Sequence, residues 1–168
     1  MPAGIVLVPE GVDRQSVADT VEAVAPGVET VTVVCGPDRR DEIERTTDAR
    51  TVSERVPDGG LVAAMRAGFR ATSALTAIVT TPEAPTVAPS ALTDLDPPAD
   101  ADARLALIDG ARHPPLGGYN VSPAVQACDV TLATGSRRLP DVLSRLSVAT
   151  TAVSTPPAES TVRAKHET

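Results

Sequence analysis

The chain has 168 residues and a formal net charge of −7, and aromatic residues make up only 1% of it. This length fits one domain with a substantial apolar core. The acidic balance disfavours binding to a nucleic-acid backbone, and the shortage of aromatic rings disfavours base stacking and the aromatic belts of membrane proteins. We therefore expect no nucleic-acid partner and no membrane partner.

The basic residues are almost all arginine, since Lys165 is the only lysine. An acidic, lysine-poor surface stays solvated in multimolar salt, where the screening length falls to about 3 Å. This composition is typical of a halophilic archaeon. The apolar start of the chain is short and lacks the basic residues of a signal peptide, and no segment approaches the roughly 20 apolar residues of a membrane span. We expect a soluble, cytoplasmic protein.

Short β-branched runs alternate with helix-like segments along the chain. In chain order, the predicted strands are 4–8, 29–35, 50–56, 75–80, 104–108, 117–121 and 148–153. The predicted helices are 12–24, 37–46, 60–73, 89–95, 123–132 and 139–146. The run 75–80 does not alternate between apolar and polar residues, which indicates a strand buried on both faces. The residues HPPL are expected to separate the strands at 104–108 and 117–121.

This order predicts the α/β class, as a single-domain, three-layer Rossmann-like fold with a mostly parallel sheet and helices on both faces. The domain is expected to span 1–157, with a helical or flexible tail at 158–168. Ligands of such folds bind beyond the carboxyl ends of the strands. Three segments are expected there: VPEGVDRQ after the first strand, ERVPDGGL before the third helix, and PEAP after the strand at 75–80.

Several motifs occur in an order that resembles the MobA-like nucleotidyltransferases, the family of the molybdenum cofactor guanylyltransferase. PEAP, with Pro89 and Leu92 after it, lies on the family's CDMP metal motif. VPDGGLVAAMRAGF fits the PGxGPLAG helix, HPPLGGYN fits the QPL...Y strand, and GSRRLPDVLSRLSV fits the G-x-x-x-L-x-x-x-L helix pair. The resemblance covers about residues 4–160 and implies the nucleotidyltransferase fold.

The resemblance also implies an activity and a set of site residues. The family transfers GMP from GTP to molybdopterin with Mg²⁺, so GTP and a molybdopterin-type acceptor are the implied partners and Mg²⁺ the implied cofactor. Glu83 takes the place of the aspartate that binds the metal, and Arg14 is in register with an arginine of the first loop; both are candidate catalytic residues. The candidate nucleotide-binding residues are Gly11, Glu54, Gly59, Gly60 and Leu61.

The first loop differs from the family pattern, because LVPEGVDRQS stands where the family has LAGGxSxRMG. The family loop is rich in glycine so that backbone N–H groups can cradle the triphosphate. Pro9 has no N–H group, and Glu10 adds a negative charge that would cost about 4 kcal/mol at 4 Å from a phosphate charge. The family's lysine-bearing segment is missing, and Ala152 and Ser154 replace the two asparagines of its NxNTPED turn.

These differences predict weakened or lost transferase activity. The alternative is a non-catalytic relative that acts as a ligand-binding or protein-interaction module, with a protein partner or as a homo-oligomer. In the family interpretation, backbone N–H groups converge at the first loop. The alternative follows if Pro9 and Glu10 prevent that convergence.

The residues by themselves leave the individual roles open. Glu83 can bind Mg²⁺, which prefers oxygen ligands, or it can be a polar turn residue between two prolines. Gly59 and Gly60 can let a base or phosphate approach the backbone, or they can form a turn with Asp58 as the helix N-cap. Arg14 can pair with a phosphate or remain solvated at the start of an exposed helix.

Three further polar residues are interpreted as structural. Glu54 is expected to be a surface charge. His113 precedes two prolines and has no acidic or thiol partner in its own segment. Tyr119 has an apolar ring to bury and a hydroxyl that needs a hydrogen-bond partner, so we expect it in the core.

Overall fold

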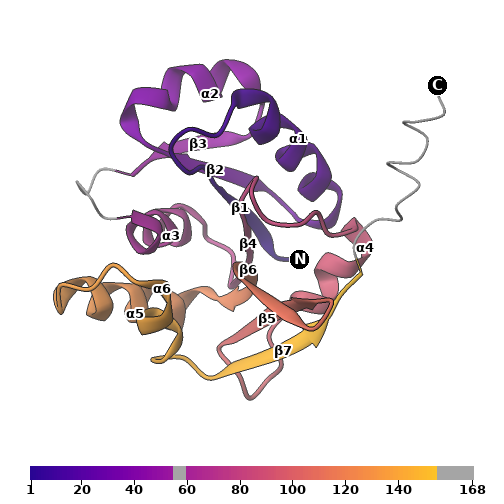
Figure 1. Cartoon of the computed structure of the whole chain (residues 1–168), viewed down its shortest axis with the longest axis vertical. Coiled ribbons are helices and arrows are strands. Elements are labelled where there is room, and N and C mark those ends of the chain that lie inside the picture. The colour runs from indigo at the N-terminus through magenta and orange to yellow at the C-terminus, as the bar shows by residue number, and fades with distance from the viewer. Residues whose placement is uncertain (55–59, 155–168) are drawn as a thin grey trace.

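The computed structural model describes residues 1–54 and 60–154, which fold around one sheet with the strand order β3-β2-β1-β4-β6-β5-β7 (Figure 1). The strands are β1 (Ala3–Leu7), β2 (Val31–Cys35), β3 (Arg50–Ser53), β4 (Thr76–Thr80), β5 (Ala103–Ile108), β6 (Ala111–Asn120) and β7 (Val148–Ala152). The α-helices are α1 (Arg14–Val24), α2 (Arg40–Thr46), α3 (Gly60–Ala71), α4 (Pro89–Leu92), α5 (Val121–Ala133) and α6 (Leu139–Leu143). Three 3₁₀ turns are η1 (Ala25–Gly27), η2 (Pro37–Arg39) and η3 (Thr93–Leu95).

The predicted α/β class and the mostly parallel sheet are confirmed. β1 pairs in parallel with β2 and β4, β2 with β3, and β5 with β7.

Within the described ranges, no helix is long and apolar enough to cross a membrane. The predicted tail at 158–168 lies outside the described residues. The predicted helix at 139–146 is shorter in the structure, where α6 ends at Leu143.

β6 is the strand that runs against its neighbours, antiparallel to both β4 and β5. A tight hairpin turn at Asp109 and Gly110 causes the reversal, and both residues have positive φ, at 54° and 81°. An Asp-Gly pair with this geometry suits the two-residue turns that match the twist of the flanking strands. The reversal brings β6 back between β5 and β4.

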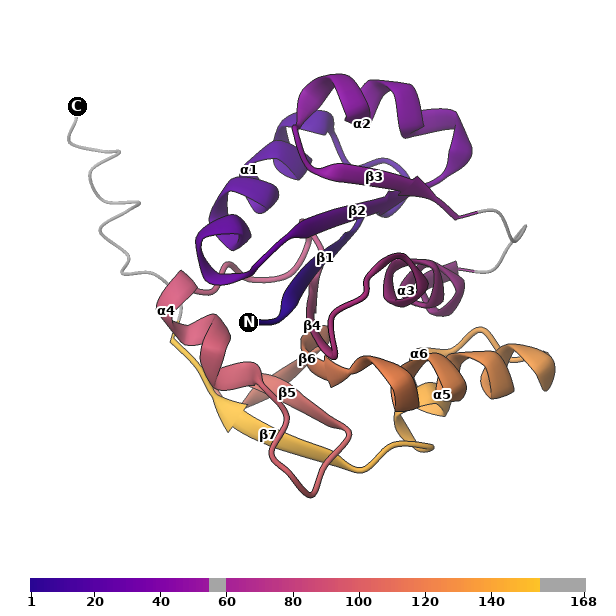
Figure 2. The ribbon, with the colours of Figure 1, turned by 180° about the vertical axis from the view of Figure 1, so that it is seen from behind.

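Helices cover both faces of the sheet, with α1, α2 and α4 on one face and α3, α5 and α6 on the other (Figures 1 and 2). β1 shows how one strand supplies both cores, because successive side chains of a strand point to opposite faces. Ile5 and Leu7 belong to the core with α3, α5 and α6, whereas Val6 packs with Val17 of α1 and Ile43 of α2.

The prediction that HPPL separates two strands is wrong, because these residues lie inside β6. β4 pairs with β6 only from Gly117 onward, and the pairing with β5 shifts between Leu105 and Leu107. Proline cannot donate to a strand ladder and is therefore confined to unpaired edges and irregularities. Pro114 and Pro115 occupy a stretch of β6 that extends past its last partner in β4. This overhang forms one wall of the candidate site.

Candidate active site

A pocket of about 230 Å³ lies at the carboxyl ends of β1 and β4. Its lining comes from the first loop, the start of α3, the turn after β4 and the overhang of β6. The lining residues are Pro9, Leu61, Thr81, Glu83, Ala84, His113, Pro114 and Pro115. The structure thus brings together the three segments that the sequence placed at this edge of the sheet, and it adds a fourth from β6.

Glu83 lies in a turn that Thr81 fixes directly after β4. The backbone amide of Glu83 donates to the hydroxyl of Thr81 at 3.0 Å, and the amide of Ala84 donates to the carbonyl of Thr81 at 3.1 Å. Thr81 is buried, whereas Glu83 is exposed. Pro82 and Pro85 restrict the backbone on either side. The turn therefore presents one solvated carboxylate at the mouth of the pocket.

His113 is the second ionisable side chain among the described lining residues, and the sequence interpretation gave it only a structural role. The part of β6 that carries His113 is held in place by Tyr119, whose hydroxyl donates to the carbonyl of Pro115 at 2.7 Å. The ring of Tyr119 is fully buried and lies 5.6 Å from that of Phe69. Burial raises the pKa of Tyr119, so this hydroxyl stays protonated as a donor. The expectation that Tyr119 is a core residue is met, with Pro115 as the partner of its hydroxyl.

The first loop connects β1 to α1 and contributes Pro9 to the pocket. Gly11 has a φ of 87° and is exposed, and the amide of Val12 donates to the carbonyl of Pro9 at 3.4 Å. Arg14 begins α1 and is exposed, and it is outside the pocket lining. Its predicted phosphate contact therefore stays a prediction.

The other predicted nucleotide-binding residues lie around the start of α3. Leu61 lines the pocket, and Gly60 opens α3 with a φ of 63°. Glu54 follows β3, where its amide donates to the carbonyl of Cys35 at 2.8 Å, and it does not line the pocket. Gly59, together with the predicted N-cap Asp58, lies outside the described residues. The structure thus supports the placement of Leu61 at the site and leaves the roles of the others as predictions.

The described residues fit Mg²⁺ only in part. They contain no group of three or more His, Cys, Asp or Glu side chains arranged to hold a metal ion. Mg²⁺ commonly keeps several waters and is bound by one or two carboxylates together with substrate phosphates. Glu83 fits that pattern as a single carboxylate, so a metal site here would have to be completed by the phosphates of a nucleotide.

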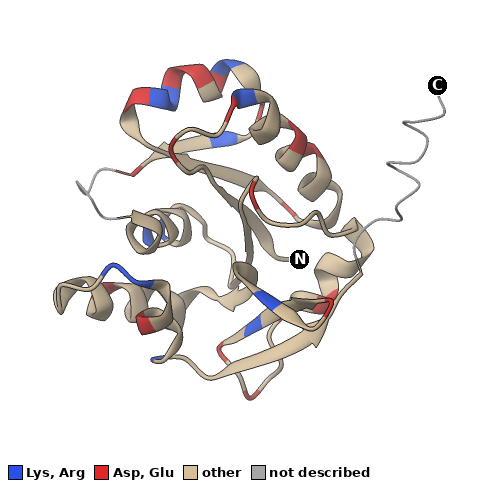
Figure 3. Ribbon diagram, in the orientation of Figure 1, with Lys and Arg blue, Asp and Glu red and all other residues tan. Residues whose placement is uncertain are grey.

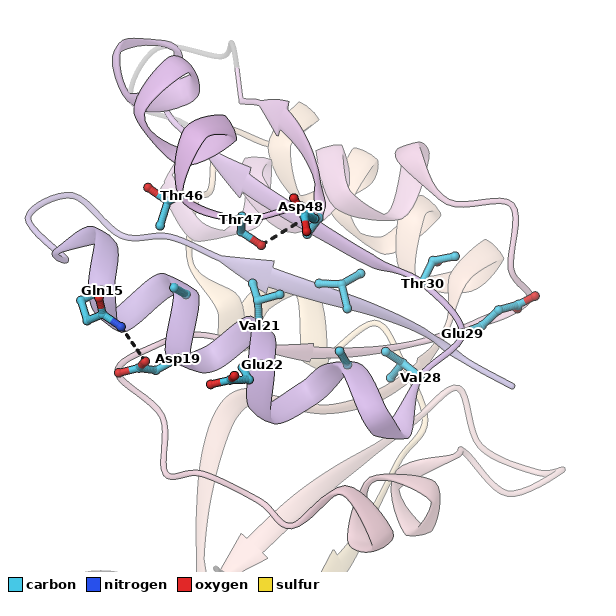
Figure 4. A pocket seen from close by; sticks show the side chains of 14 residues that line it. Gln15, Asp19, Val21, Glu22, Val28, Glu29, Thr30, Thr46, Thr47 and Asp48 are labelled. Atoms are coloured by element: carbon cyan, nitrogen blue, oxygen red, sulfur yellow. Dashed lines mark hydrogen bonds between the residues drawn. The ribbon is translucent and has the colours of Figure 1, made fainter. Parts of the chain in front are cut away.

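A larger groove of about 590 Å³ lies away from this edge, between α1, the start of β2 and the segment that precedes β3 (Figure 4). Its acidic residues are Asp19, Glu22, Glu29 and Asp48. Asp19 accepts a hydrogen bond from the side-chain amide of Gln15 at 2.9 Å. Four carboxylates would repel a triphosphate, so volume alone does not make this groove the nucleotide site. The smaller pocket at the carboxyl ends is the better candidate.

The sequence pattern of the MobA-like NTP transferase domain matches residues 12–151. The chain belongs to this family. The family match starts at Val12, after β1 and part-way through the altered first loop, and ends within β7. A comparison with curated protein sequences finds no match.

Solved structures share the fold of this family member at low sequence identity. A protein from Aquifex aeolicus has a TM-score of 0.76 and 11% identity, covering 95% of this chain and 89% of its own. The molybdopterin-guanine dinucleotide biosynthesis protein A from Archaeoglobus fulgidus has a TM-score of 0.70 and 20% identity, covering 98% and 88%. A nucleotidyl transferase from Methanothermobacter has a TM-score of 0.63 and 18% identity, covering 93% and 88%. These similarities establish the nucleotidyltransferase fold.

Proposed function

We propose that the protein binds GTP together with Mg²⁺ at the pocket of Glu83 and transfers GMP to a molybdopterin-type acceptor, at a rate reduced by its altered first loop. The observation that carries this proposal is the convergence of Pro9, Leu61 and Glu83 at the carboxyl ends of β1 and β4. Membership of the MobA-like family and the fold shared with the Archaeoglobus protein support the same reaction class.

Nucleotidyl transfer of this kind forms one bond and breaks one. An oxygen of the acceptor's phosphate attacks the α-phosphorus of GTP, and the bond to the β-phosphate breaks with loss of pyrophosphate. The ion, when bound, neutralises charge on the phosphates and aligns them. Glu83 supplies a carboxylate ligand at the mouth of the pocket, and His113 can donate a hydrogen bond to a phosphate oxygen. The pocket, at about 230 Å³, is below the roughly 300 Å³ at which ligand pockets begin, so it encloses only part of a nucleotide.

The first loop explains why we propose a reduced rate. Pro9 lines the pocket but has no N–H group to offer to a phosphate. Glu10 follows it as an exposed carboxylate in the same turn. Both residues weaken binding of the triphosphate without removing the metal position at Glu83.

The second candidate function is that of a non-catalytic ligand-binding or protein-interaction module. Two observations favour it: the described residues include no lysine, and the pocket has one carboxylate rather than a cluster. In this alternative the fold and the pocket persist, but no triphosphate is bound.

Calorimetric titration in high KCl tests the proposal. We expect GTP to bind at micromolar concentration only when Mg²⁺ is present, and the Glu83→Gln variant to lose at least about tenfold in affinity, because it removes a charged metal ligand. The matched control is Glu22→Gln, which removes an exposed carboxylate in the distant acidic groove and should bind as the wild type does.

A second measurement separates the two functions. Release of pyrophosphate from GTP that depends on a molybdopterin acceptor, and that is lost in Glu83→Gln, would establish the transferase. Absence of GTP binding at millimolar concentration would refute the proposal and favour the non-catalytic alternative.

A further inference from the structure

An arginine from a different part of the chain contacts the first loop. Arg39 is the last residue of η2, which follows the carboxyl end of β2. One terminal nitrogen of its guanidinium donates to the backbone carbonyl of Val12, and its Nε donates to the carboxylate of Glu42 at 3.1 Å. Because β1 and β2 are adjacent in the sheet, the two loops that leave their carboxyl ends are neighbours in space.

The pair formed by Arg39 and Glu42 holds the guanidinium in a fixed direction. The hydrogen bond from Arg39 lowers the pKa of Glu42, and the charges of Arg39, Arg14 and Arg45 act in the same direction, so this carboxylate stays ionised at neutral pH. The side chain of Arg39 is 21% exposed and that of Glu42 is 38% exposed. A partly exposed ion pair adds little to the stability of the fold, because solvent screens it. The effect of this contact is therefore expected on the position of the loop more than on global stability.

The other restraints on the first loop lie at its C-terminal end, where Val12 packs against the core around Ile43 and the carboxylate of Asp13 accepts a hydrogen bond from the hydroxyl of Ser16 at 2.6 Å. The loop runs from Pro9 to Asp13, and the hydrogen bond that closes its turn, from Val12 to Pro9, is long at 3.4 Å. Gly11 at the centre of the turn adds conformational freedom, with a φ of 87° and no neighbour within 4 Å of where a side chain would begin. The planar guanidinium of Arg39 binds two acceptors at once and so links the loop to α2.

We propose that Arg39 is a positioning residue that holds the first loop at the edge of the pocket for the binding of nucleotide phosphates. The part that concerns nucleotide rests on the proposed function, whereas the restraint on the loop does not. Pro9, at the start of the same loop, lines the pocket, so a displacement of Val12 is transmitted to the pocket wall. The sequence gives no sign of this role, since Arg39 is one of several charged residues on an exposed segment.

The test compares two neighbouring arginines. Arg39→Met removes the donors but keeps most of the apolar stem. Arg40→Met is the matched control, because Arg40 makes an ion pair with Glu44 of its own helix at 3.3 Å and is more exposed, at 43%. Arg39→Lys keeps a donor and should recover most of the wild-type behaviour. Backbone ¹⁵N order parameters of Gly11 and Val12 report the loop directly, and GTP titration reports the site.

We expect the order parameters of Gly11 and Val12 to fall from about 0.85 to below about 0.6 in Arg39→Met and to stay unchanged in Arg40→Met. In Arg39→Met, the affinity for GTP measured by titration should fall about tenfold. In a rate assay, the same change should appear as an increase in KM with little change in kcat. Unchanged order parameters in Arg39→Met would overturn the proposal, as would a loosened loop with wild-type affinity for GTP. If the wild-type protein binds no GTP, the proposed function fails, while the order parameters still confirm or overturn the restraint on the loop.

Discussion

Glu10 is the residue whose charge conflicts most directly with the proposed ligand. It is exposed in the turn between β1 and α1, next to Pro9 of the pocket wall. Repulsion from a phosphate charge at 4 Å is about 4 kcal/mol at an effective dielectric of 20, but solvent reduces it at an exposed position. The residue therefore weakens binding of a triphosphate by an amount that one substitution can measure.

We predict that Glu10→Gln binds GTP about tenfold more tightly than the wild type, because it removes the charge and keeps the size of the side chain. Calorimetric titration at moderate salt, where screening is weaker, measures the difference. Glu22→Gln, which makes the same charge change at the distant groove, is the control. Equal affinities in Glu10→Gln and the wild type would mean that the triphosphate does not approach this loop.

At the scale of single residues, both cysteines behave as core residues. Cys35 and Cys128 are buried and unpaired. Burial raises the pKa of the Cys35 thiol, and burial together with the charge of Asp129 raises the pKa of the Cys128 thiol to about 12. The thiolate is the reactive form, so neither side chain is suited to nucleophilic chemistry in the native protein.

At the scale of elements, β6 decides the shape of the site. Its first half forms the overhang with His113, and its second half pairs with β4. Gly118 allows η3 to pack against this strand, because a β-carbon at Gly118 would lie 1.9 Å from the carbonyl oxygen of Leu95. That carbonyl belongs to the backbone and cannot move aside as a side chain can. The position of β6 therefore depends on a glycine here.

We predict that Gly118→Ala lowers the free energy of unfolding by about 3 kcal/mol or more, because the added methyl group displaces η3 from the sheet. Urea unfolding followed by circular dichroism gives the value. Gly36→Ala is the control, since a β-carbon there would meet nothing within 4 Å and the φ of −68° suits alanine. A Gly118→Ala variant as stable as Gly36→Ala would show that η3 does not pack on β6 in this way.

The charge of the whole molecule sets how its stability responds to salt. The net charge is −7, and acidic residues are spread over α1 and α2 together with arginines (Figure 3). Self-repulsion of a charged surface destabilises the compact state, and salt screens it. The ion pairs of Arg39 with Glu42, of Arg40 with Glu44, and of Arg66 and Arg70 with Asp129 are all at least partly exposed, so their loss in salt costs little.

We predict that raising KCl from about 0.1 M to about 2 M raises the Tm at pH 7 by about 5 °C or more, because screened repulsion outweighs the weakened ion pairs. Differential scanning calorimetry measures this shift. The same series near the isoelectric point of about 4.8 is the control, where the net charge is close to zero and the shift should be smaller. A Tm that falls with KCl at pH 7 would contradict the halophilic interpretation of the composition.

The sequence by itself determined the α/β class, the approximate place of each α-helix and of each strand except the first half of β6, and the position of Glu83 after β4. These depend on local patterns: runs of β-branched residues, amphipathic spacing, and prolines that open helices or end strands. The sequence also predicts that Pro9, Leu61 and Glu83 lie close to one another, since parallel strands present their carboxyl ends at one edge of a sheet. The sequence also contains the signal for the reversal of β6, the Asp-Gly pair at 109–110, but this local signal does not place His113 at the pocket.

Only the tertiary structure decided which side chains complete the pocket and what holds its walls. His113 reaches the pocket because β6 continues past its last partner in β4, and a register between strands distant in sequence is not written in either strand alone. The contact from Arg39 to the carbonyl of Val12 joins residues 27 positions apart, and the hydroxyl of Tyr119 meets Pro115 only because the strand places them together. Such contacts arise from packing whole elements against each other, because their free energy depends on relative position and not on local propensity.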